Sequence, residues 1–194
     1  NNTIKTLKQG GLILYPTEKE IQDVLLPIIG QFVWGAQQGY GSFLNLEFGN
    51  PKTKFSGIHK PKEENKFPFN EFENRHVKIK GEYSFFIYMS NWKIYAKDNE
   101  LAHDESEREE IEFALGFING QKLTKVIINA NKNITELEFD LGGIIVISDE
   151  HYSDEINELW NFYTKSEKVL TYRNDRKVTY EKTEFGKEKF TEIT

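Results

Sequence analysis

The stretch that decides the fold runs from residue 31 to residue 49 and has the sequence QFVWGAQQGYGSFLNLEFG. It contains two runs rich in apolar residues, Gln31 to Gln37 and Ser42 to Phe48, which are joined by Gly39-Tyr40-Gly41. Glycine tolerates the positive φ angles of a tight turn, so the two runs are expected to pair. The stretch therefore predicts a β-hairpin over residues 31–49.

Alternation predicts which side chains of this hairpin share a face, because successive residues of a strand point to opposite sides of the sheet. The residues expected on one face are Phe32, Trp34 and Ala36 in the first strand and Leu44, Leu46 and Phe48 in the second. The other face of the second strand would then carry Phe43, Asn45 and Glu47.

The same hairpin offers a candidate ligand-binding site, since its glycines would let a ligand approach the backbone. The candidate contact residues are Trp34, Gln37, Tyr40, Asn45 and Glu47. Two explanations stay open, because glycine in a hairpin turn needs no ligand and Glu47 could be an outward-facing strand residue. A ligand contact predicts that Glu47→Gln abolishes binding without lowering the melting temperature.

Short strand-like runs continue on both sides of the hairpin. The expected strands are 12–15, 76–80, 82–89, 92–97, 123–129, 134–140, 144–148, 158–164, 168–173 and 177–182. The three runs between residues 76 and 97 are so closely spaced that they indicate a meander. The connection 50–75 is long enough to be functional or mobile.

Two segments have the spacing of short helices. Thr17 and Glu20 stand three residues apart, as in a capping box, at the start of an apolar periodic stretch that predicts a helix over 18–28. Ser106 and Glu109 show the same spacing before a helix predicted over 107–119. The fold class expected is α+β, predominantly antiparallel β with two short helices, in two β-rich halves.

The charge is unevenly distributed along the chain. The net charge is −6, but residues 1–98 carry 13 Lys+Arg and 10 Asp+Glu, whereas residues 99–194 carry 12 and 21. The halves are thus +3 and −9, and we place a domain boundary near residue 98, a helix and β-meander over 99–182, and a tail over 183–194. Neither half has the basic excess expected of a nucleic-acid-binding domain.

Composition excludes several other classes of protein. The chain has no cysteine, so it has no disulfide, thiol nucleophile or Cys-ligated metal. Its longest apolar run, Phe85 to Met89, is far shorter than the ~20 residues of a membrane span. The start, Asn1-Asn2-Thr3, lacks the pattern of a secretory leader, and we expect a cytoplasmic protein with no membrane partner.

No catalytic, cofactor or metal motif stands out. The serines lack the G-x-S-x-G elbow of hydrolases, and the glycines lack the spacing of a phosphate-binding loop. The four histidines are scattered, and His103-Asp104 and Asp149-Glu150-His151 would each supply two metal ligands at most. We therefore expect neither a metal nor a cofactor, and lean towards a protein that is not an enzyme.

Two motifs resemble known groups of proteins. The segment W-G-x-x-x-G-x-G-S-F-L-x-x-E-F-G, over residues 34–49, is followed by Gly81-Glu82, and together they resemble a group of uncharacterised bacterial proteins. The stretch Leu123 to Val146 is similar to small β-rich domains found in bacterial toxin-immunity neighbourhoods. This resemblance implies a shape and a setting and assigns no catalytic residue.

The leading hypothesis is a non-enzymatic bacterial interaction protein of the immunity or inhibitor type, with a protein partner such as a toxin. Its binding surface would be the acidic segment around residues 104–112 or the connection 50–75. The candidate partner-binding residues are Asp104, Glu105, Glu109 and Glu112. The alternative is a small-ligand or carbohydrate-binding or carbohydrate-acting protein that uses the hairpin Trp34–Gly49.

Overall fold

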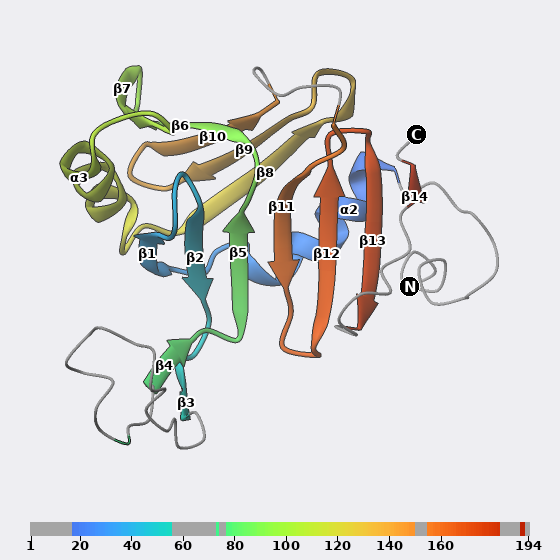
Figure 1. Cartoon of the computed structure of the whole chain (residues 1–194), viewed down its shortest axis with the longest axis horizontal. Coiled ribbons are helices and arrows are strands. Elements are labelled where there is room, and N and C mark those ends of the chain that lie inside the picture. Colours follow the sequence, from blue (N-terminus) through green and yellow to red (C-terminus); the bar gives the residue numbers. More distant parts are fainter. Residues whose placement is uncertain (1–16, 56–72, 74–76, 150–154, 183–190, 193–194) are drawn as a thin grey trace.

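The computed structural model describes residues 17–55, 73, 77–149, 155–182 and 191–192. It confirms the fold class, because most of the chain is antiparallel β-sheet with short helices (Figure 1). The helical elements are α2 (Glu18–Leu25), the 3₁₀ turn η1 (Leu26–Ile28), α3 (Arg108–Ile118) and the 3₁₀ turn η3 (Ala130–Lys132). The expected strand 12–15 lies outside the described residues.

The described strands form two sheets and a ribbon. The large sheet has the order β1 (Val33–Gln38), β2 (Leu44–Phe48), β5 (Tyr83–Ile87), β11 (Glu158–Tyr163), β12 (Lys168–Arg173), β13 (Lys177–Lys182) and β14 (Thr191–Glu192). The small sheet has the order β7 (Asn99–His103), β6 (Asn91–Ala96), β10 (Gly143–Ser148), β9 (Ile134–Phe139) and β8 (Leu123–Asn129). The ribbon pairs β3 (Lys52–Phe55) with β4 (Val77–Lys80).

The expected meander over residues 76–97 is wrong. Its three strands, β4, β5 and β6, belong to the ribbon, the large sheet and the small sheet respectively. Gly81 and Ser90-Asn91 look like hairpin turns in the sequence, but each redirects the chain into a different sheet. The physical reason is burial: β5 buries Phe85 and Ile87 completely, and it does so between β2 and β11 in the large sheet.

Three strands were not expected. β3 lies within the connection 50–75, β7 lies between the expected strand 92–97 and the expected helix 107–119, and β14 lies within the expected tail 183–194. All three are mostly polar and lie at the edge of a ladder, where pairing needs little apolar patterning. In β7 the one fully buried side chain is Ala102, so the hydrophobic signal is weak.

The charge boundary near residue 98 does not separate the two sheets. It falls between β6 and β7, which pair with each other. Each sheet also contains strands from both sides of this boundary, since β5 pairs with β11 and β6 pairs with β10. The buried apolar side chains of both sheets belong to a single cluster.

Two buried tryptophans join the two sheets, and one of them, Trp160, belongs to a stack of aromatic rings within the large sheet. The ring of Trp160 lies 5.0 Å from that of Phe85 and 5.2 Å from that of Tyr172, measured between centroids. The Trp160 indole N–H donates to Oγ1 of Thr135 in the small sheet at 3.0 Å. In the other direction, the Trp92 indole of the small sheet donates to the carbonyl oxygen of Ser42 at 2.6 Å. Both tryptophans are fully buried.

The two helices begin differently. Thr17 and Glu20 form the expected capping box on α2. The cap expected at Ser106 is wrong: α3 starts after Glu107, whose side chain makes no cap, and the Ser106 hydroxyl instead accepts from the His103 backbone N–H at 3.1 Å. Among the described residues, no helix is long and apolar enough to cross a membrane.

Trp160→Phe should lower the free energy of unfolding by about 2–3 kcal/mol, because it removes part of the stack and leaves Thr135 without its donor. Urea denaturation measures this loss. Thr135→Val removes the acceptor alone, so the double variant should lose less than the sum of the two single losses. Strict additivity would show that the bond between the sheets contributes nothing.

The stability should fall at alkaline pH because of Tyr172. Burial, together with a smaller effect of the nearby Glu18 carboxylate, raises the pKa of this phenol to about 12. The folded state favours the neutral phenol, so stability is complete below about pH 10 and declines by roughly 2 kcal/mol as the pH rises towards 12. Denaturant unfolding of Tyr172→Phe should show a flatter decline, and an unchanged decline would contradict this assignment.

Candidate functional site

The hairpin over residues 31–49 forms as expected, but a β-bulge changes its faces. The pairing of β1 with β2 shifts register between Trp34 and Gln37, and Gly35 adopts a φ of +59° there. The bulge resets the alternation, so Val33 and Ala36 face the core while Phe32 is 56% exposed. The expectation that Phe32, Trp34 and Ala36 share one face is therefore wrong.

Glu47 is neither an outward-facing residue nor an exposed ligand contact. Its side chain is 4% exposed, and its carboxylate accepts three hydrogen bonds. The Asn45 amide donates to Oε1 at 2.8 Å, and the Gly81 backbone N–H and the Ser84 hydroxyl donate to Oε2 at 2.8 and 2.5 Å. These bonds compensate the carboxylate for its lost hydration and tie β2 to the start of β5.

Close packing explains why the Gly81-Glu82 motif begins with glycine. A Cβ at this position would overlap the carbonyl oxygen of Phe48 and lie 2.9 Å from its backbone nitrogen. Only glycine lets the chain pass this close to β2, where its N–H reaches Glu47. The motif therefore has a structural reason within the chain.

The other hairpin candidates do not converge on one cavity with Glu47. Trp34 is half-buried, donates its indole N–H to the Gly49 carbonyl oxygen at 2.8 Å, and lines a shallow hollow beside Pro51. Gln37 is exposed and pairs with the half-buried Asn45. Tyr40 is 88% exposed at the turn. The geometry brings Asn45 and Glu47 together, while Gln37 and Tyr40 lie on open surface.

Two of the four acidic candidates have partners inside the chain. The Asp104 carboxylate accepts from the Asn91 amide at 2.9 Å and is half-buried. Glu112 accepts from the Arg108 guanidinium at 2.7 Å, and this bond raises the pKa of Arg108 above its ordinary value. Glu105 and Glu109 are exposed at the amino-terminal end of α3.

The exposed side of α3 carries two features that the sequence analysis did not single out. Phe113 is 69% exposed, although the helix buries Ile111, Leu115 and other apolar residues on its opposite side. Gly116 lies one turn further on, also exposed, and a Cβ there would meet nothing within 4 Å. The sequence signal for this surface is a phenylalanine and a glycine three residues apart on the charged side of the predicted helix.

The histidine clusters give no metal site in the part of the chain that the structure describes. His103 Nδ1 lies 3.2 Å from Glu100 Oε1 and 3.2 Å from Ser106 Oγ. No group of three or more metal-ligating side chains occurs among the described residues. Asp149 has a pKa raised by burial, and its neighbours at 150 and 151 lie outside the described residues.

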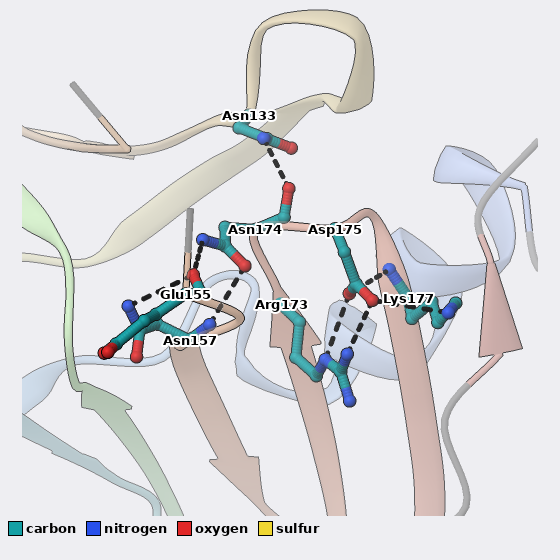
Figure 2. Close-up of polar contacts among 7 residues, drawn as sticks. All are labelled: Asn133, Glu155, Asn157, Arg173, Asn174, Asp175 and Lys177. Carbon is teal, nitrogen blue, oxygen red and sulfur yellow. Dashed lines mark hydrogen bonds and ion pairs between the residues drawn. The ribbon is translucent and has the colours of Figure 1, made fainter. Parts of the chain in front are cut away.

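A polar cluster holds the turn between β12 and β13 in place (Figure 2). Asp175 accepts two hydrogen bonds from Arg173, at 3.0 and 2.5 Å, and lies 3.4 Å from Lys177 Nζ. The Asn174 carbonyl oxygen accepts from the Asn133 amide at 2.7 Å, which links the large sheet to the small one. Because this bond connects the two sheets, the cluster acts as a structural junction.

Glu47→Gln should destabilise the protein by about 2–4 kcal/mol, because an amide nitrogen would face one of the donors that the carboxylate now accepts. The melting temperature and the free energy of unfolding in urea both report this loss. The exposed Glu105→Gln is the matched control and should change neither. An unchanged melting temperature for Glu47→Gln would instead favour the ligand-contact hypothesis.

Comparisons with known proteins found no match. No family model matches the chain, and no curated protein or solved structure matches it. The resemblance to the bacterial group and to immunity-type domains therefore stays a prediction.

Proposed function

We propose that this protein is a non-enzymatic binding protein of the inhibitor or immunity type, and that it binds a basic partner protein across the exposed side of α3. The observation that carries the proposal is that Phe113 and Gly116 are both exposed on this side of the helix. Glu109, Glu112, Phe113 and Gly116 recur at the spacing of one helical face. We call these four residues the α3 stripe.

Phe113 supplies an apolar anchor for a partner. A phenylalanine that is 69% exposed on a short helix forgoes the stabilisation of about 2 kcal/mol that burial would provide. Aromatic side chains surrounded by polar ones are typical of the residues that contribute most to protein–protein binding.

Gly116 supplies room for close approach. Glycine inside a helix costs about 1 kcal/mol relative to alanine, and at this position neither a positive φ nor a packing contact requires it. Glycine at this position is explained if the backbone or a side chain of a partner packs directly on the helix.

The surrounding charge determines the kind of partner. Glu109 within the stripe and Glu105 beside it are both exposed, and the half of the chain that contains them has a net charge of −9. A negative surface attracts a positive one over several ångströms and raises the rate of association. Asp104 has a structural bond to Asn91 and supports the segment, so we assign the contact to Glu105 and Glu109.

Gly116→Ala should separate stability from binding. In the free protein it should raise the free energy of unfolding by about 1 kcal/mol, because alanine favours the helix and its methyl group meets no atom. In the complex the same methyl group should weaken binding. Unfolding in urea and the dissociation constant of the complex measure the two effects.

The partner can be identified with matched variants. Immobilised wild-type protein should retain a basic protein from a lysate of the source organism, Phe113→Ser should lose it, and Leu141→Ser should keep it. Leu141 is the control because it is 67% exposed on a turn of the small sheet. Rising salt should release the partner. Equal retention by all variants, or turnover of a small molecule by the purified chain, would refute the proposal.

A further inference from the structure

A hollow of about 490 Å³ lies where the β3–β4 ribbon meets one end of the large sheet. In Figure 1 this is the lower end of the molecule, where β5 begins, β13 ends and the turn between β11 and β12 lies. The residues that line it are Lys52, Lys80, Gly81, Glu82, Ser84, Tyr163, Thr164, Lys165, Glu167 and Lys182. A volume of this size suits a small organic ligand.

The lining has an excess of positive charge. Four lysines, from β3, β4, the β11–β12 turn and β13, stand against two glutamates. Lys52 Nζ lies 3.9 Å from Glu82 Oε1, at a site where the lysine side chain is 55% exposed, so this pair offsets little of the charge. The lysine hollow, as we call it, is positive in a chain whose net charge is −6.

The strand registers place lysines opposite each other. Lys52 pairs directly with Lys80 across the ribbon. In the large sheet, Lys182 pairs with Lys168. Like charges at directly opposed positions of a sheet destabilise it. A bound anion would reduce the repulsion between Lys52 and Lys80, which both line the hollow, so their register is a second observation in favour of a ligand.

Two polar groups in the wall are already bonded within the fold. The Gly81 N–H and the Ser84 hydroxyl both donate to the buried Glu47 carboxylate, so they point away from a ligand in the hollow. Lysine ammonium groups bind phosphate as point charges, whereas planar carboxylates favour arginine forks. The geometry favours a ligand with several phosphate charges.

We propose that the lysine hollow binds a small organic polyphosphate, of the size of a nucleoside diphosphate, through Lys52, Lys80, Lys165 and Lys182. A nucleic acid fits less well, because its backbone needs a broad basic surface and this lining includes Glu82 and Glu167. The proposal concerns a site distinct from α3 and does not depend on the partner-binding function.

Calorimetric titration of the full chain tests the proposal with three probes: inorganic pyrophosphate, ADP and AMP. Pyrophosphate and ADP should bind, AMP should bind about tenfold more weakly, and all three should weaken as salt rises. Lys80→Gln combined with Lys165→Gln should reduce ADP affinity at least tenfold. The control pair, Lys122→Gln and Lys125→Gln, changes exposed lysines at β8 and should leave ADP affinity unchanged.

A stability measurement separates lost binding from lost fold. Without ligand, Lys80→Gln should be as stable as the wild type or more stable, because it relieves the repulsion from Lys52. With ADP, the melting temperature should rise for the wild type and stay constant for the double variant. The proposal is overturned if neither ADP nor pyrophosphate binds at millimolar concentration, if the control pair loses as much affinity, or if only a single-stranded oligonucleotide binds.

Discussion

The burial of the Phe85, Trp160 and Tyr172 rings against the small sheet is the interaction on which the rest of the structure depends. These rings come from three adjacent strands, β5, β11 and β12, and the Trp160 indole bonds to Thr135 across the gap between the sheets. Removing such large apolar surfaces from water is the main favourable contribution to folding. The large sheet therefore forms only when the chain brings β5, near its middle, next to β11 and β12, near its end.

This long-range pairing explains the polar features of the large sheet. Once β5 lies between β2 and β11, the residue at position 81, just before β5, lies so close to the Phe48 backbone of β2 that it has to be glycine. Glu47 is then enclosed, and its carboxylate is stable there because Asn45, Gly81 and Ser84 donate to it. The β3–β4 ribbon extends from the same end of the sheet, where Lys52 and Lys80 line one side of the hollow.

The fold class and most strands could be predicted because they follow from local patterns. Alternation located β2 and β9, and the Thr17–Glu20 spacing located the start of α2. The errors arose where a local pattern had two outcomes. Gly35 introduced a bulge that exchanged the faces of β1, and Ser106 bonded to His103 instead of capping α3.

By itself the sequence determined the antiparallel β-rich class, the hairpin over residues 31–49, the two short helices and the acidic character of residues 99–194, because each depends on residue types a few positions apart. The tertiary structure alone decided that Glu47 is a buried structural carboxylate, that Phe113 and Gly116 share an open helical face, and that lysines from four elements line one hollow. These features depend on registers and packing between distant segments, such as those of Lys52 and Lys182, and the spacing of neighbouring residues does not specify such contacts.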